Sequence, residues 1–342
     1  MDMKALLTGP RGRRLLLELA VRLSDAVREA LFDLAYAHNP GRDTSCVLVT
    51  WGDVEPRKAA SIEELTALLR ALPEDPLSPD LVHEALGASV DSAMYWQEPD
   101  GEDVVARMPS VQEALAPLAE RVSTIAWTAP APSVQHLLEW EPPIPAARTD
   151  LAAWVRSTRD AEQQARRERP QDPAAAWSGS WWSIPLDQPV TYDEVPRALD
   201  LIEDELGWEK CTTTPVQGPT EVLEITGAED WAKLCREHPL EVTASRRHDW
   251  YRVTGRDGTW VIPDWEAVSR RWGAVHLTVP GYLTAATTLI DVADGVASVI
   301  AGWNPGSTLW LREAPGKPIG PSQHWRWRDD DDGAGRWHPV DP

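Results

Sequence analysis

The stretch EVTASRRHDWYRVTGRDGTWVIPDW, residues 241–265, gathers arginine, histidine and tryptophan side chains around one predicted turn. If residues 242–253 are extended, the alternation of a strand places Arg246, His248 and Trp250 on one face. A guanidinium binds phosphate or carboxylate through paired hydrogen bonds, an imidazole titrates near neutral pH, and an indole stacks on planar rings. This face therefore predicts a binding site for an anionic, nucleotide-like ligand, with His248 as a candidate catalytic group.

The same residues also allow a purely structural interpretation. In that case Arg246, Arg247 and Asp249 form surface salt bridges while Trp250 packs in the core. Trp260 follows the predicted turn and is a second candidate for stacking on a ligand.

The stretch AVHLTVPGYLTAA, residues 274–286, predicts a strand followed by a helix with proline in its first turn. His276 and Thr278 share one face of that strand, and Tyr282 follows at the start of the helix. Because helix N-termini attract anions, His276 and Tyr282 are candidate catalytic groups and Thr278 is a candidate ligand-binding group. The alternative is a buried strand whose polar side chains bond the local backbone.

Two further stretches carry candidates. In AGWNPGSTLWL, residues 301–311, Trp303 and Asn304 stand beside a predicted turn and are candidate ligand-binding residues. The simpler interpretation of that stretch is a hairpin. In GSWWSIP, Trp181 and Trp182 face opposite sides of an extended segment, so one can be core and the other a pocket wall.

The order of the predicted helices and strands that carry these residues indicates an α+β protein. The length of 342 residues indicates two domains. Residues 1–145 predict a helix-rich N-terminal domain, which includes a strand over 44–53. A Pro-rich break leads into a connecting helix and linker over 146–172. Residues 173–314 alternate strand and helix signals and predict an α+β domain with a mainly antiparallel sheet, and 315–342 predict an acidic, Trp-containing, partly ordered tail.

Local patterns within the C-terminal domain predict individual elements. YDEVPRALDLIEDELGW, residues 192–208, predicts a helix, and DWYRVTGRDGTWVIP, residues 249–263, predicts a hairpin.

Composition excludes several classes of function. The net charge of −21 opposes binding to nucleic acids and to anionic membranes. No apolar run reaches the roughly 18–20 residues of a membrane helix, so a cytoplasmic protein is expected. The three cysteines are widely spaced and favour neither a zinc site nor a disulfide framework.

The sequence names no cofactor. It lacks the glycine-rich signatures of phosphate loops and dinucleotide sites, and no two histidines share metal-ligand spacing on one element. Tryptophan is the compositional exception, with 19 residues against one phenylalanine.

The stretches WSGSWWSIP, TASRRHDWYR, VHLTVPGYL and AGWNPGSTLWL resemble an uncharacterised family of actinobacterial proteins. That resemblance implies a soluble bacterial protein and no particular activity. The C-terminal half also resembles, more weakly, compact ADP-ribosyltransferase folds. This second resemblance implies that Arg246 or His248 holds NAD, that Tyr282 follows it, and that a late glutamate orients the nucleophile. Here NPGST stands where that glutamate is expected, and Glu313 comes only after it.

Two functions are consistent with these observations. The first is binding or modification of a nucleotide-like or other anionic small molecule, which requires Arg246, His248 and His276 to converge on one pocket. The second is a non-catalytic regulatory role in which the acidic, Trp-rich surface binds a protein partner. It requires an exposed aromatic patch.

Overall fold

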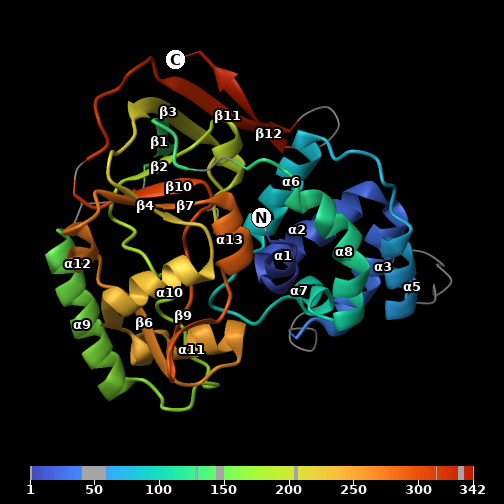
Figure 1. Cartoon of the computed structure of the whole chain (residues 1–342), viewed down its shortest axis with the longest axis horizontal. Helices are drawn as coiled ribbons and strands as arrows, with labels where there is room; N and C mark the ends of the chain where they lie inside the picture. Colours follow the sequence, from blue (N-terminus) through green and yellow to red (C-terminus); the bar gives the residue numbers. More distant parts are fainter. Residues whose placement is uncertain are drawn as a thin grey trace.

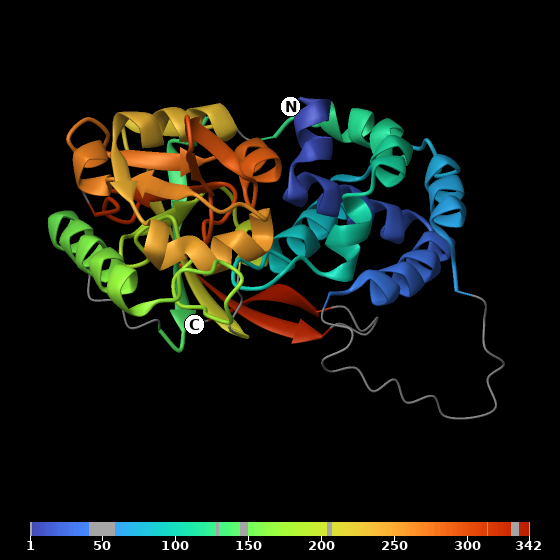
Figure 2. The same cartoon turned by 90° about the horizontal axis from the view of Figure 1, so that it is seen from below.

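The computed structural model describes residues 2–40, 59–127, 130–143, 150–203, 207–312, 314–329 and 335–341. A helical part and a sheet-rich part lie side by side (Figure 1 and Figure 2). This arrangement confirms the predicted α+β class, with a helix-rich N-terminal part and a mainly antiparallel sheet in the C-terminal half. The strand predicted over 44–53 and the late Glu313 lie outside the described residues.

The helical part consists of α1 (Met3–Thr8), α2 (Pro10–Leu23), α3 (Asp25–His38), α5 (Ile62–Arg70), α6 (Pro79–Asp91), α7 (Gly101–Ala106) and α8 (Pro109–Ser123). Local signals set several of these helices. Ser61 caps α5 by accepting a hydrogen bond from Glu64 N, and Leu65 and Leu69, one turn apart, are both buried. A search of the described helices finds no segment with the length and apolarity of a membrane span.

The larger sheet has the strand order β12–β11–β3–β1–β2–β10–β7–β4. Its strands are β1 (Val134–Glu141), β2 (Val190–Tyr192), β3 (Lys210–Gln217), β4 (Val222–Ile225), β7 (Ala274–Leu277), β10 (Ser307–Trp310), β11 (Gln323–Asp329) and β12 (Gly335–Val340). Neighbouring strands are antiparallel except β4 and β7. β1 precedes the boundary predicted at residue 145, yet it pairs with β2 and β3.

The smaller sheet has the order β5–β6–β9–β8. It comprises β5 (Pro239–Glu241), β6 (Thr259–Pro263), β8 (Ile290–Ala293) and β9 (Val296–Ser298). The helices of this half are α9 (Leu151–Glu168), η1 (Arg197–Asp200, a 3-10 helix), α10 (Ala228–Glu237), α11 (Thr243–Thr254), α12 (Trp265–Ser269) and α13 (Val279–Ala285).

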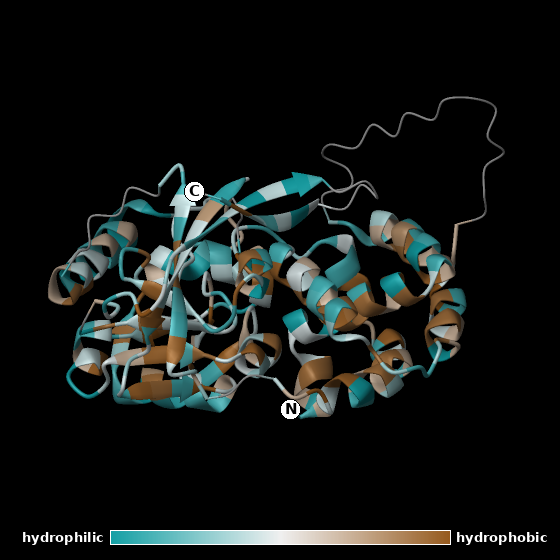
Figure 3. Cartoon of the chain, turned by 90° about the horizontal axis from the view of Figure 1, so that it is seen from above, coloured by the Kyte–Doolittle hydropathy of each residue, from teal (hydrophilic) through white to brown (hydrophobic). Residues whose placement is uncertain are grey.

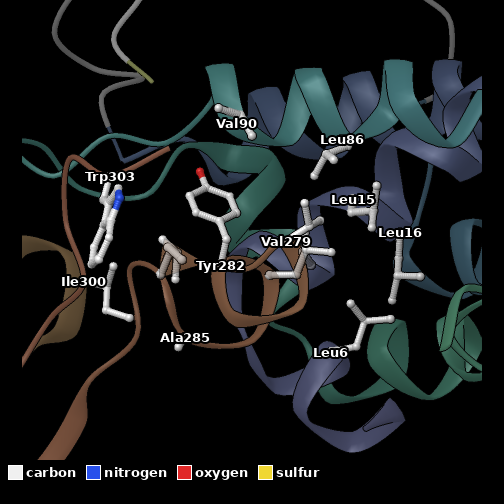
Figure 4. Packing of buried hydrophobic residues seen from close by; sticks show 14 of the residues in the cluster. Leu6, Leu15, Leu16, Leu86, Val90, Val279, Tyr282, Ala285, Ile300 and Trp303 are labelled. Atoms are coloured by element: carbon white, nitrogen blue, oxygen red, sulfur yellow. The ribbon is translucent and has the colours of Figure 1, made fainter. Parts of the chain in front are cut away.

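One cluster of buried apolar side chains runs through both parts (Figure 4). Leu15 and Leu86 from the helical part belong to the same cluster as Tyr282 and Trp303 from the sheet-rich part. The parts meet closely where α1 turns into α2, because a Cβ added at Gly9 would lie 2.6 Å from the carbonyl oxygen of Leu283. The two parts are therefore packed into one body along α13.

The strand predicted over 242–253 is wrong, because these residues form α11. The first turn of α11 is held by a carboxylate from a distant helix: Glu162 accepts hydrogen bonds from Ala244 N at 2.9 Å and Ser245 N at 2.8 Å. Gly255, at φ 71°, ends the helix in the left-handed conformation. The hairpin predicted over 249–263 is wrong for the same reason.

Three further local predictions differ from the structure. Tyr192 pairs with His136 and Ser307 in the sheet, so the helix predicted over 192–208 is reduced to η1 among the described residues. β9 and β10 belong to different sheets, so the segment with Asn304 is not a hairpin. The C-terminal segment forms β11 and β12, whose residues are mainly hydrophilic (Figure 3), and β11 extends the large sheet by pairing with β3.

Candidate functional site

A cavity of about 340 Å³ lies between the helical part and the sheet-rich part. Its apolar wall includes Leu77, Val82 and Leu86 from the helical part and Ala198, Leu201 and Val279 from the sheet-rich part. Its polar wall includes His83, Trp127, Asp193, Glu194 and Arg197. A mainly apolar cavity with a few polar side chains is the usual form of a small-molecule site.

The sheet positions a carboxylate–imidazole–carboxylate set behind this wall. His276 on β7 lies directly opposite Glu224 on the parallel neighbour β4. Asp193 follows the last residue of β2, and its backbone N–H donates to Gly306 O at the start of β10. The imidazole of His276 joins the two acids: Nδ1 lies 2.6 Å from Glu224 Oε2, and Nε2 lies 3.1 Å from Asp193 Oδ2.

Burial and hydrogen bonding fix the charge of this set. Burial alone lowers the pKa of the His276 imidazole, but the hydrogen bonds to Asp193 and Glu224 outweigh it and raise the pKa to about 9. Burial raises the pKa of the Asp193 carboxyl, and the hydrogen bond with His276 opposes this rise. At neutral pH the imidazole is therefore a fully buried imidazolium between two carboxyl groups.

Two polar atoms of the wall are left without partners. Asp193 Oδ1 is buried and has no hydrogen-bond partner among the described residues, and the same holds for the indole nitrogen of Trp127. A buried polar group without a partner costs free energy, so such atoms mark places where a ligand or water completes the site. One is an acceptor and the other is a donor.

The basic groups of the wall already face acids. His83 Nε2 lies 2.8 Å from Asp200 Oδ2, and the Arg197 guanidinium lies 3.7 Å from Asp80 and 3.9 Å from Glu194. Among the described wall acids, Asp193 is the one with a buried oxygen that lacks a partner, and the cavity favours a cationic or hydrogen-bond-donating group over an anion.

The first predicted cluster lies on the helix α11 and not on a strand face. Arg246 borders a different cavity, and His248 is buried with neither ring nitrogen hydrogen-bonded among the described residues. Burial, followed by Arg247, lowers the pKa of His248. Within the described residues, Arg246 and His248 share no hydrogen-bond partner with His276.

The predicted stacking residues on this stretch are core residues. Trp250 and Trp260 are fully buried and pack edge to face with ring centroids 5.3 Å apart. The indole N–H of Trp250 donates to Trp181 O at 2.9 Å. Thr278 caps α13, accepting from Gly281 N at 3.0 Å and donating to Ile225 O at 3.1 Å, so its hydroxyl is engaged locally.

Two other predicted residues meet at Glu203, which sequence reasoning missed. The Tyr282 hydroxyl donates to Glu203 Oε1 at 2.7 Å, and Tyr95 donates to the same oxygen at 2.6 Å. Asn304 Oδ1 accepts from Glu203 N at 2.9 Å. Burial raises the pKa of Glu203 to about 7, although both tyrosines and Arg11 act in the opposite direction. This cluster joins the two parts of the protein.

Trp303, labelled in Figure 4, is 1% exposed. Its ring packs against Trp231 and Trp265. It is a core residue of the sheet-rich part.

Asp193 and Glu224 were also missed by sequence reasoning. Glu224 had a detectable signal, since it is the one charged residue of the short strand VLEI, whose neighbours are apolar. Asp193 had no such signal, because the local sequence predicts a helix around it. The end of β2 just before Asp193 is determined by pairing with the distant strands β1 and β10.

Comparisons of the chain with protein-family models, with curated proteins and with solved structures find no match. Function must therefore be argued from the chemistry of the site itself.

Proposed function

We propose that the protein binds a small molecule with an apolar body and a protonated amine, or another hydrogen-bond donor, in the cavity between its two parts. Asp193 is the observation that carries the proposal. It lines the cavity, one carboxylate oxygen is held by His276, and the other is buried without a partner among the described residues. An ammonium group placed there would form a charge-assisted hydrogen bond in an apolar surrounding, where such bonds are strongest.

His276 and Glu224 support Asp193 in this proposal. Glu224 orients the imidazole, and the imidazole orients the carboxyl group that contacts the ligand. Because the pKa of Asp193 is raised and His276 holds a proton up to about pH 9, the pair can also exchange a proton with a bound molecule. That capacity suits acid–base modification of the ligand as well as its binding.

The proposal keeps the small-molecule function expected from the sequence, but it places the site beside His276 and changes the expected charge of the ligand. Asp193 and Glu194 supply negative charge to the cavity wall, and both basic residues there face carboxylates. A nucleotide-like anion fits this wall poorly.

Matched ligand pairs test the proposal. Each pair shares one apolar skeleton and only one member carries the ammonium group, such as tryptamine with the neutral 3-ethylindole, or phenethylamine with ethylbenzene. We expect amines to raise the melting temperature of the protein, because a ligand at 100 times its Kd stabilises the folded state by about 2.7 kcal/mol. Asp193→Asn should weaken amine binding by about tenfold or more.

Two variants distinguish amine binding in the cavity from amine binding to exposed carboxylates elsewhere on the protein. Asp25→Asn removes an exposed carboxylate and should leave amine binding unchanged, whereas Ala126→Trp places a bulky side chain at an exposed position of the cavity wall and should block it. The proposal fails if amine binding survives both Asp193→Asn and Ala126→Trp.

A further inference from the structure

A second cavity, of about 280 Å³, is lined by residues of α9, of the segment 180–187 and of α11. Trp154, Ser157 and Ala161 on α9 form one wall, while Trp182 and Arg246 form another. We call this cavity the α9–α11 groove. It has no lining residue in common with the cavity beside Asp193.

Arg246 is the unusual residue of the groove. Its side chain is only 7% exposed, and it forms no ion pair among the described residues. Its Nε donates to Trp182 O at 3.2 Å, and neither terminal nitrogen has a protein partner among the described residues. Burial, followed by the charge of Arg169, lowers the pKa of Arg246 to about 10, although Glu162 and Asp249 act in the opposite direction. A buried guanidinium without a counter-ion is costly, so its retention needs an explanation.

The two carboxylates whose charges act on Arg246, Glu162 and Asp249, form no ion pair with it among the described residues. Glu162 uses its oxygens to cap α11 and to bind Arg166 at 2.9 Å. Asp249 accepts from Gly179 N at 3.1 Å and from Arg252 at 2.9 Å. Arg246 therefore lines the groove with two terminal nitrogens that lack a hydrogen-bond partner among the described residues.

We propose that the α9–α11 groove binds an oxyanion attached to a planar ring, with Arg246 as its ion partner and Trp154 and Trp182 as the apolar walls for the ring. A guanidinium offers two parallel hydrogen bonds to a phosphate or a carboxylate, and indoles accept planar rings. This site is independent of the cavity beside Asp193 and takes a ligand of opposite charge. Asp187 also lines the groove, so its negative charge opposes the anion.

Isothermal titration with matched probes tests this site. AMP and indole-3-propionate carry the anion, whereas adenosine and the neutral 3-ethylindole lack it. We expect the two anions to bind and adenosine not to bind, with affinity falling as salt rises. Arg246→Met should weaken anion binding by about tenfold or more, while Asp187→Asn should strengthen it by removing the like charge.

Control variants test whether anion binding occurs in the α9–α11 groove. Asp193→Asn should leave anion binding unchanged, which distinguishes the two cavities. Arg246→Met should keep or raise the melting temperature, because it removes a buried charge without a counter-ion. Should that variant fail to fold, Ala161→Trp blocks the groove from an exposed position on α9. Absence of anion binding at millimolar concentration, or binding that persists in Ala161→Trp, would overturn the proposal.

Discussion

Asp193 and His276 show how far single residues can be identified from sequence. His276 was a candidate because it shares a predicted strand face with Thr278, just before a helix N-terminus that could attract an anion. Its partners, Glu224 and Asp193, lie 52 and 83 positions away in the chain. No local pattern encodes such distances, since the pairing of β2, β10, β7 and β4 creates them.

The raised pKa of His276 predicts a pH dependence of stability. The folded protein holds this proton more tightly than the unfolded chain, whose imidazole has an ordinary pKa of 6.5. The stabilisation is therefore fully present below pH 6.5 and is lost as pH rises through about 9. Urea denaturation between pH 6.5 and 10 should show a fall in unfolding free energy on the order of 3 kcal/mol from this group.

Glu224→Gln tests whether His276 causes the fall in unfolding free energy between pH 6.5 and 10. It keeps the size of the side chain but removes one of the two acids that raise the pKa of His276. The fall above pH 6.5 should become smaller in this variant. An identical fall in both proteins would mean that another group titrates.

At the scale of elements, the sequence predicted helices well where caps and periodicity were local. The strand and helix predicted over 274–286 are β7 and α13, and Ser61 and Asp264 cap α5 and α12. The failure at 243–254 has a physical cause. Its Trp, Tyr, Val and Thr residues favour strands, but Glu162 on α9 supplies the missing N-terminal cap and Gly255 supplies the end.

β11 and β12 bear on the alternative function of protein-partner binding. Trp337 on β12 is 8% exposed, lies 5.7 Å from Trp140 and 5.6 Å from Trp327 between ring centroids, and so packs within its own chain. This packing reduces the aromatic surface that the tail could offer a partner. Partner binding itself stays a prediction.

Trp337→Ala tests whether the C-terminal strands are an integral part of the sheet. Loss of a packed indole should lower the unfolding free energy by about 3–5 kcal/mol, measured by urea denaturation. Trp177, which is 39% exposed, is the matched control, and Trp177→Ala should cost about 1 kcal/mol or less. Equal small effects would mean that the tail contributes nothing to the fold.

At the scale of the whole molecule, the site exists because two parts meet. Composition and pattern predicted a helical part and a sheet-rich part. Their junction could not be predicted, because the cavity combines residues near α6 with Asp193, Arg197 and Val279. The shared core, centred on contacts such as Gly9 with Leu283, holds these walls in place.

The central claim is that Asp193 receives the donor group of a ligand in this cavity. A crystal structure of the protein soaked with tryptamine tests it most directly. We expect the ammonium nitrogen to lie within hydrogen-bonding distance of Asp193 Oδ1, about 3 Å, with the indole against Leu86 and Val279. Tryptamine bound elsewhere, with this cavity filled only by water, would contradict the account.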